Sequence, residues 1–274
     1  MPVTETAPKV TGLKAEAQKQ WTDDACGYAG GAGFEQGSAE YFAAVDRDRY
    51  EIYAPWMKTV MGYDGYRGKS VLEIGYGQGT DLMQFAKGGA KVTGVDLSPT
   101  HQRLARKRFE LAGIPADLRL ADAETLPFPD ATFDVVYSFG VIHHTPGTQD
   151  VINEIYRVLK PGGKAILAVY HRHSVFSAVF AARWLREKSW RSDSLESAYW
   201  RIEEQSADRG ARPLVKRYGR AAFRKMLFAF SSVRLAVDHL GLTPDQRAFK
   251  VIPAFMRPFL ARHFGWYLIA FCEK

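Results

Sequence analysis

Three glycines at alternate positions, Gly75, Gly77 and Gly79, lie in the stretch "VLEIGYGQGT", directly after a short apolar run. Glycine allows a backbone to turn at positive φ and to approach a ligand without a Cβ in the way. The segment "TDLMQFAKGG" that follows predicts a helix whose first N–H groups point back at the turn, where they suit an anionic group. The stretch therefore predicts a ligand site at a strand-to-helix turn.

Acidic residues stand near this turn and after the next two apolar runs. Glu73 precedes the first glycine by two residues, Asp96 ends "KVTGVD", and Asp122 ends "ADLRLAD". A carboxylate at the end of the second strand of a nucleotide-binding unit accepts hydrogen bonds from ribose hydroxyls. Dinucleotides and other adenosine-containing cofactors share this feature, so Asp96 alone leaves both ligands open.

Short runs rich in β-branched and apolar residues alternate with helical patterns along the chain. Such alternation requires crossover connections, hence a doubly wound α/β fold with a mostly parallel sheet covered on both faces. Ligands bind such sheets beyond the carboxyl ends of the strands, where the glycine turn and the acids fall. The predicted strands are 70–75, 91–96, 116–122, 133–140 and 164–170; the predicted helices are 80–89 and 98–113, the second with Ser98 as N-cap, Pro99 in its first turn and Gly113 at its end.

Length and composition favour one main domain. With 274 residues and 46% hydrophobic content, the chain can bury one large core with additions at its ends. No apolar run reaches the roughly 18 residues that cross a bilayer, and residues 1–20 contain no apolar signal core, so we expect a soluble, cytoplasmic protein. Cys26 and Cys272 form neither a disulfide framework nor a zinc spacing, so we expect two reduced thiols and no metal site.

The net charge of +7 is unevenly distributed. Residues 1–170 contain 18 Lys and Arg against 21 Asp and Glu, whereas residues 171–274 contain 19 against 9. The basic excess thus belongs to the last hundred residues. An anionic substrate, an anionic membrane surface, nucleic acid and a merely solvated face all fit this asymmetry.

The glycine turn differs from a dinucleotide fingerprint. Counted from Gly75, the pattern G-x-G-x-x-G needs glycine where Thr80 stands. The order acid-x-G-x-G-x-G, starting at Glu73, instead resembles motif I of class I S-adenosylmethionine-dependent methyltransferases. The segments "ADAETLPF", "FPDATFDVVYSFGVIHHT" and "INEIYRVLKPGGKAIL" resemble later motifs of that family in the same order, most of all its type 11 small-molecule group.

This resemblance implies a Rossmann-like sheet of seven strands whose last strand is antiparallel. Residues 231–240 and 264–274 would supply strands six and seven. It further implies a methyltransferase domain over residues 61–274, a helical N-terminal segment over residues 1–60 that closes over the cofactor, and an inserted helical cap over residues 171–217. The helical stretch 244–263 is long for its position, and we expect it to add to the acceptor pocket.

The implied cofactor is S-adenosylmethionine, with S-adenosylhomocysteine as the product and no metal required. In the family, the acid at Asp122 accepts from the adenine amino group and the N–H of Ala123 reaches the ring, while the glycine turn holds the methionine end. The expected cofactor-binding residues are Glu73, Gly75, Tyr76, Gly77, Gly79, Asp96, Leu97, Asp122, Ala123 and Ser138.

Methyl transfer to an alcohol, phenol or ammonium group also requires that the acceptor lose a proton, which histidine can take near neutral pH. His143 and His144 follow the fourth predicted strand, and His171 and His173 follow the fifth. His143, His144 and His171 are our candidates for the general base. Substrate binding or loop packing are the alternatives for each of them.

The expected acceptor is a small molecule, anionic or lipid-like, with an O, N or C nucleophile. Enzymes that methylate nucleic-acid bases usually carry an acid or Asn followed by Pro-Pro and an aromatic where this chain has residues 138–141, "SFGV", so a nucleic-acid partner is not expected. Two other classes of function stay open: a nicotinamide-dependent oxidoreductase, and a non-catalytic cofactor-binding or membrane-associated module. The acceptor's identity and the oligomeric state are not determined by the sequence.

Two segments outside the shared core allow alternative interpretations. In residues 21–60, Tyr41, Arg49 and Tyr50 either touch the methionine end of the cofactor or pack on the sheet. In residues 171–217, apolar residues at 175, 176, 179, 180 and 184 have helical spacing, with Arg183, Arg186 and Lys188 nearby. That helix is a lid over the acceptor, a helix on a membrane surface with possible peripheral contact, or a buried helix of the cap.

Overall fold

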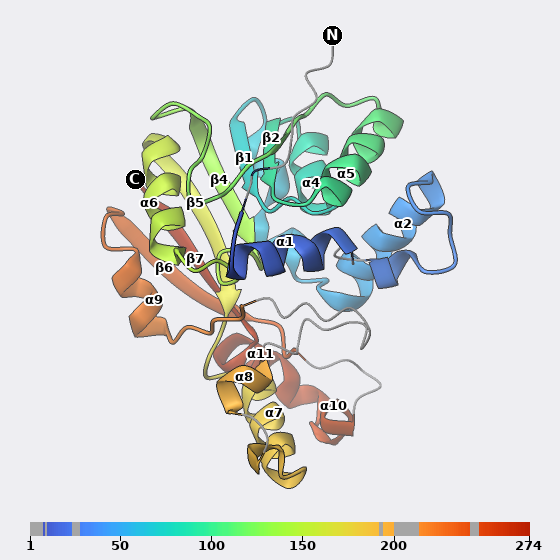
Figure 1. Cartoon of the computed structure of the whole chain (residues 1–274), viewed down its shortest axis with the longest axis vertical. Helices are drawn as coiled ribbons and strands as arrows, with labels where there is room; N and C mark the ends of the chain where they lie inside the picture. Colours follow the sequence, from blue (N-terminus) through green and yellow to red (C-terminus); the bar gives the residue numbers. More distant parts are fainter. Residues whose placement is uncertain (1–7, 9, 24–27, 192–193, 200–213, 242–246) are drawn as a thin grey trace.

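The computed structural model describes residues 8, 10–23, 28–191, 194–199, 214–241 and 247–274. A seven-stranded sheet crosses the molecule with helices on both faces, and a lobe of short helices lies below it in the view of Figure 1. The strands are β1 (Ser70–Ile74), β2 (Lys91–Asp96), β3 (Asp117–Leu120), β4 (Phe133–Phe139), β5 (Leu159–Tyr170), β6 (Ser232–Asp238) and β7 (Tyr267–Glu273).

The strand order is β3-β2-β1-β4-β5-β7-β6. Neighbouring strands are parallel from β3 to β5, and β7 runs antiparallel to both β5 and β6. The doubly wound fold with an antiparallel last strand is therefore confirmed. The chain runs outward from β1 in one direction and from β4 in the other, which puts the topological switch point between these two strands.

The predicted elements form where local signals mark their ends. Helix α4 (Thr80–Lys87) follows the glycine turn, and α5 (Pro99–Ala112) begins where the Ser98 hydroxyl accepts a hydrogen bond from the His101 N–H and ends at Gly113, with φ +64°. The fifth strand begins at Leu159, five residues earlier than predicted. Leu159 pairs with Phe133 before the register shifts, so the Pro-Gly-Gly segment lies within β5.

Both faces of the sheet are buried, as the nearly continuous apolar strands predict. Successive residues alternate between two cores, because side chains of a strand point to opposite faces. Val71 and Val135 belong to the core that includes Phe85 of α4, whereas Leu72 and Val136 belong to the core on the other face. That second core is covered by α6 (Thr148–Val158) and α9 (Arg220–Met226).

The N-terminal segment packs at the carboxyl edge of the first strands. Helix α1 (Leu13–Asp23) crosses in front of the sheet (Figure 1). The Gln18 amide donates to the Leu97 carbonyl at 3.0 Å, and the Ser98 hydroxyl donates to the Trp21 carbonyl at 2.9 Å. The segment continues through η1 (Tyr28–Gly31), α2 (Ala39–Arg47), η2 (Asp48–Tyr53), α3 (Met57–Met61) and η3 (Tyr63–Tyr66).

The lobe below the sheet comes from the two long insertions. It contains α7 (Val175–Arg186), η4 (Ser189–Arg191), α8 (Leu195–Tyr199), α10 (Arg247–Val251), η6 (Ala254–Met256) and α11 (Arg257–Phe264). The Phe176 ring lies 4.4 Å from that of Trp266, and the Phe180 ring lies 4.4 Å from that of Tyr199. The apolar stripe of α7 is thus partly buried by aromatic contacts, and its role as a cap remains a prediction.

Some of the predictions fall on residues outside the described ranges. These are Cys26 and parts of the predicted cap and of stretch 244–263, at 192–193, 200–213 and 244–246. Cys272 is buried in β7, and burial raises its pKa to about 12. Within the described ranges, no helix has the length and apolar content that crossing a membrane requires.

A polar cluster ties together the starts of three strands. The Asp134 carboxylate accepts hydrogen bonds from the backbone N–H of Ser70 at 2.8 Å, from its hydroxyl at 2.7 Å and from the Lys160 ammonium at 3.0 Å. The hydrogen bonds from Ser70, and then the Lys160 charge, hold the pKa of Asp134 well below its usual range. The ionised carboxylate therefore stabilises the junction of β1, β4 and β5.

We expect Asp134→Asn to lower the free energy of unfolding by about 1 to 2 kcal/mol at pH 7, because a charge-assisted acceptor is lost. A lowered folded-state pKa gives stability that is complete above the unfolded value and is lost as pH falls through the folded value. The difference between the two proteins should therefore be complete at pH 5, begin to shrink by pH 3 and shrink further at lower pH. Urea unfolding at both pH values measures it, and a pH-independent difference would contradict the assigned role of the charge.

Candidate functional site

A cavity of about 410 Å³ opens at the carboxyl edge of the sheet, at the switch point between β1 and β4. Its wall combines the turn after β1, the ends of β2 and β4, the loop after β3, and residues Lys14, Ala17 and Trp21 of α1. Ligands of doubly wound sheets bind at this place. The N-terminal segment contributes to the wall.

The glycine turn has the close approach and the positive φ angles that glycine permits. Gly75 has φ +73°, and a Cβ there would lie 2.3 Å from a methyl carbon of Val141. Gly77 has φ +54° and faces open space, and its N–H donates to the Asp96 carboxylate at 2.9 Å. The turn therefore passes tightly against the loop after β4 while presenting backbone to the cavity.

Asp96 connects this turn to the start of α5. One carboxylate oxygen accepts from the Gly77 N–H, the other accepts from the Ser98 N–H at 2.9 Å, and the His101 Nδ1 lies 3.1 Å away. Burial alone would raise the pKa of Asp96, but His101 and the two backbone N–H groups lower it overall. The cavity thus contains a fixed, ionised hydrogen-bond acceptor.

Glu73 contrasts with Asp96, because its pKa is raised rather than lowered. It is buried and lines the same cavity, and its Oε2 atom has no hydrogen-bond partner. Burial, followed by the nearby negative charge of Asp81, raises its pKa well above the usual value. A buried carboxyl oxygen without a partner costs free energy that a cationic ligand group would recover.

Asp81, in the first turn of α4, has its charge compensated. Arg49 donates to its two oxygens at 2.9 and 3.4 Å, and the hydroxyls of Tyr50 and Tyr137 donate at 2.7 and 2.8 Å. Burial opposes ionisation, but Arg49 and the hydrogen bonds lower the pKa of Asp81. Arg49 lines the cavity, so the network sets a cation beside the glycine turn. Of the three residues proposed in segment 21–60, Arg49 lines the cavity, whereas Tyr41 packs in a core with α5 and Tyr50 packs in the core of the sheet.

Asp122 lies on the far side of the cavity, in the loop after β3. Its carboxylate accepts from the Glu124 N–H at 3.0 Å and pairs with the Lys14 ammonium of α1, which also pairs with Glu124. The ion pair fastens α1 across the cavity. Since a carboxylate has about four acceptor positions, Asp122 keeps capacity for another donor.

The structure separates the other predicted cofactor residues into two groups. Tyr76, Leu97 and Ala123 line the cavity. Gly79 and Ser138 lie outside its wall: a Cβ on Gly79 would lie 3.1 Å from the Phe109 ring, and the Ser138 hydroxyl donates to the Ile74 carbonyl at 3.1 Å. Gly79 therefore allows α4 and α5 to pack, and Ser138 joins β4 to the end of β1.

The three candidate bases also differ in place. His144 lines the cavity, and its Nδ1 lies 2.7 Å from the Leu214 carbonyl, which assigns the proton to Nδ1 and makes Nε2 the acceptor atom. His143 is fully buried outside the wall, and neither of its ring nitrogens has a partner. His171 is buried against the Gly265 carbonyl at 3.1 Å. Burial lowers the pKa of both His143 and His171.

Aromatic side chains form the end of the cavity away from Asp122. They are Tyr53, Phe139, Tyr170 and Tyr267, and the hydroxyls of Tyr53 and Tyr267 lie 2.6 Å apart. None of the described residues of 171–217 or 247–263 lines this cavity, so these helices flank it rather than form its wall. No local pattern predicts this wall, because its four residues come from four separate segments of the chain.

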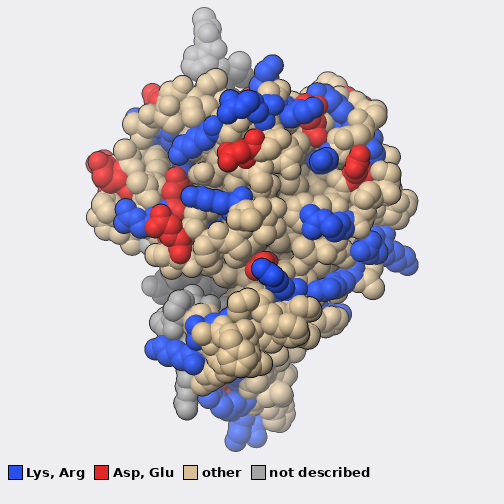
Figure 2. Space-filling model, turned by 180° about the vertical axis from the view of Figure 1, so that it is seen from behind, with Lys and Arg blue, Asp and Glu red and all other residues tan. Residues whose placement is uncertain are grey.

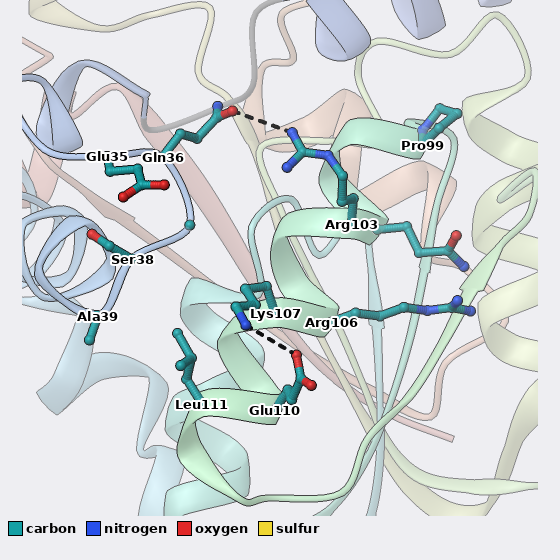
Figure 3. Close-up of a pocket in the computed structure, with 12 residues that line it drawn as sticks. Glu35, Gln36, Ser38, Ala39, Pro99, Arg103, Arg106, Lys107, Glu110 and Leu111 are labelled. Carbon is teal, nitrogen blue, oxygen red and sulfur yellow. Dashed lines mark hydrogen bonds and ion pairs between the residues drawn. The ribbon is translucent and has the colours of Figure 1, made fainter.

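A second hollow, of about 660 Å³, lies between α5 and residues 35–39 (Figure 3). Its cationic side chains are exposed and already bonded: Arg103 to Gln36, Arg106 to the Leu118 carbonyl, and Lys107 to Glu110. It shares no lining residue with the first cavity. Across the described ranges, no three His, Cys, Asp or Glu side chains gather as a metal site requires.

Comparison with known proteins places the central part of this fold in a family. Residues 72–167 match the family model described as "Methyltransferase domain". A sterol 4-C-methyltransferase of Caenorhabditis elegans is 40% identical over 98 residues, which are 35% of this chain and 29% of that protein. A demethylmenaquinone methyltransferase of Tropheryma whipplei is 34% identical over 122 residues, 43% of this chain and 49% of that protein. The chain thus spans half or less of these relatives' lengths.

The similarity of the fold extends further along the chain. A solved structure of an S-adenosylmethionine-dependent methyltransferase from Methanosarcina mazei superposes with a TM-score of 0.53 at 17% identity, covering 78% of this chain and 96% of that one. The strand order, the glycine turn at the switch point and the family match agree. Residues 72–167 therefore match the methyltransferase family model, and the fold of the chain resembles that of solved S-adenosylmethionine-dependent methyltransferases.

Proposed function

We propose that this protein transfers the methyl group of S-adenosylmethionine to a small, predominantly apolar acceptor. The observation that carries the proposal is the buried, partnerless carboxyl oxygen of Glu73 in a cavity that also presents Arg49 and the acids Asp96 and Asp122. An amino acid joined to adenosine needs these groups together: an anion for its ammonium, a cation for its carboxylate, and acceptors for its ribose and adenine.

Each end of the cavity has a distinct task in this proposal. Glu73 and Arg49 would hold the amino and carboxylate groups, Asp96 the ribose hydroxyls, and Asp122 with the Ala123 N–H the adenine. When bound, the cofactor supplies an electrophilic sulfonium methyl that needs no metal assistance. The protein contributes alignment and exclusion of water, to which Lys14 adds by fastening α1 over the cavity.

The aromatic end of the cavity supports an apolar acceptor. Phe139, Tyr170 and Tyr267 present ring surfaces, and the Tyr53–Tyr267 hydroxyl pair offers a polar contact. The two relatives compared above are named as methyltransferases of a sterol and of demethylmenaquinone. We infer an acceptor of the same class, an apolar ring or chain that carries one reactive polar or carbon centre.

His144 is the general base that the cavity supports best. The Leu214 carbonyl orients its ring with Nε2 as the acceptor, and the Trp21 ring lies 5.6 Å from it in an edge contact. His144 would take the proton that the acceptor loses on methylation. His143, buried outside the wall with lowered pKa, instead packs 4.0 Å from the Tyr170 ring and supports this end of the cavity.

The acceptor is found by incubating the protein with S-adenosylmethionine labelled in its methyl group and with the aqueous and lipid fractions of a cell extract. The proposal expects label in a small molecule of the lipid fraction. Label confined to protein or nucleic acid would overturn it, and binding of a nicotinamide dinucleotide in place of S-adenosylmethionine would favour an oxidoreductase.

We expect Asp96→Ala to weaken S-adenosylmethionine binding by at least about 100-fold, because the ribose acceptor and the anchor of the Gly77 N–H are lost together. Isothermal titration calorimetry measures the affinity. Asp117→Ala is the matched control, since Asp117 is an exposed acid on the neighbouring strand β3 that pairs with Arg119. Equal affinity of the Asp96 variant and the control would refute the assignment.

We expect Glu73→Gln to weaken cofactor binding about tenfold at pH 7.5, through loss of a charged hydrogen bond. The raised pKa of Glu73 in the empty cavity adds a pH dependence. A bound cation lowers that pKa, so binding releases a proton and the affinity of the native protein rises with pH. The ratio of the native protein's affinity to that of the variant should therefore grow from pH 6 to pH 8. The titration of the cofactor's own amino group affects both proteins alike. A constant ratio would contradict the role of Glu73.

We expect His144→Phe to lower turnover with the identified acceptor by about 100-fold or more while the cofactor dissociation constant changes less than about twofold. His173→Phe is the control, because His173 is exposed and lies outside the cavity wall. Single-turnover rates over pH 6–9 distinguish a base from a packing residue: only loss of a base removes the acidic limb of the rate profile.

A further inference from the structure

The segment that joins β6 to β7 leaves large apolar side chains in solvent. The exposed fractions are 71% for Val251 in α10, 83% for Phe255 in η6 and 57% for Phe259 in α11. Pro253, Ala254 and Pro258 between them are exposed too. Side chains of this kind normally bury most of their surface, and a contiguous exposed apolar patch marks an interaction surface.

The charge of this segment has one sign. Residues 249–264 contain three Lys and Arg and no Asp or Glu, and residues 175–191 of the same lobe contain four against one. Lys250 and Arg262 are exposed beside the apolar residues, whereas Arg257 packs its guanidinium over the Phe249 ring. Figure 2 shows blue side chains around a broad tan surface on the lobe below the sheet.

We propose that Lys250, Val251, Phe255, Phe259 and Arg262, the lobe face, bind the surface of an anionic lipid bilayer. Apolar side chains on a short helical segment insert at the boundary between headgroups and acyl chains, and adjacent cations meet anionic headgroups. The exposed apolar side chains and the adjacent cations together match a bilayer surface, which has an apolar interior and anionic headgroups. Binding is peripheral, by side chains of short helices.

Charge also decides between a bilayer and a second copy of the chain. A symmetric dimer through the lobe face would bring two sets of cations together with no acid of residues 249–264 to pair them. An anionic bilayer supplies the complementary charge. The lobe face therefore favours lipid over self-association.

The lobe adjoins the cavity through both of its connections to the sheet. Tyr170, at the end of β5, precedes α7 by five residues, and Tyr267, at the start of β7, follows α11 by three. Both line the aromatic end of the cavity. Docking of the lobe face would hold that end beside the bilayer, yet the docking itself requires no methyl transfer and is tested without it.

The test is co-sedimentation of the full chain with vesicles of phosphatidylcholine alone and of phosphatidylcholine with about 30% phosphatidylglycerol. We expect binding to the anionic vesicles at least about tenfold stronger than to the neutral ones, and weaker in 0.5 M NaCl because salt screens the headgroups. Phe255→Ser with Phe259→Ser should abolish most of it. Lys250→Gln with Arg262→Gln should reduce it by about fivefold for each cation.

The controls are Phe34→Ser with Leu111→Ser, at 50% and 49% exposure, and Lys69→Gln with Lys91→Gln, exposed cations outside the lobe. These should bind vesicles like the native chain, and all variants should keep its thermal unfolding midpoint. Equal binding of native protein to neutral and anionic vesicles, or equal losses in lobe and control variants, would overturn the proposal. The proposal would also be overturned if the native chain did not bind vesicles but formed a dimer in analytical ultracentrifugation that only the lobe variants dissociate.

Discussion

The hydrogen bonds of the Asp96 carboxylate are the constraint on which the site depends. They join the Gly77 N–H of the turn after β1 to the Ser98 N–H at the start of α5, with His101 as a third contact. The turn can then present its backbone to the cavity without collapsing into it. Because the carboxylate is buried, its interactions are stronger than at a surface and fix the geometry before any ligand arrives.

Two buried acids beside this turn show how environment divides chemical roles. Asp81 is compensated by Arg49 and two tyrosine hydroxyls, so its charge is part of the scaffold. Glu73 has an oxygen with no partner, so its charge is unfavourable until a cation enters. A ligand group with a positive charge beside Glu73 would therefore offset the free-energy cost of this unsatisfied acid.

The additions to the sheet have separate structural roles. Helix α1 is held by Lys14 to Asp122 and Glu124, across the part of the cavity expected to hold adenine. Phe176 and Phe180 of the lobe make aromatic contacts, the first of them with Trp266, whereas Phe255 and Phe259 are exposed to solvent. The central sheet is thus flanked by helix α1, which covers the cavity, and by the lobe, which has exposed apolar side chains.

The sequence by itself determined the features that depend on neighbours along the chain. Residue type and spacing predict strands such as 70–74 and 91–96, the Ser98 cap and the glycines with positive φ. The order of the motifs also predicted the methyltransferase family model that residues 72–167 match. Only the tertiary structure decided which residues meet across long separations. It paired Arg49 with Asp81 and Lys14 with Asp122, put Ser138 behind the cavity wall, and distinguished His144 from His143 and His171. Sequence patterns do not distinguish His143 from His144, because the two residues are adjacent and have the same side chain. Their burial and hydrogen-bond partners differ only when distant segments pack together.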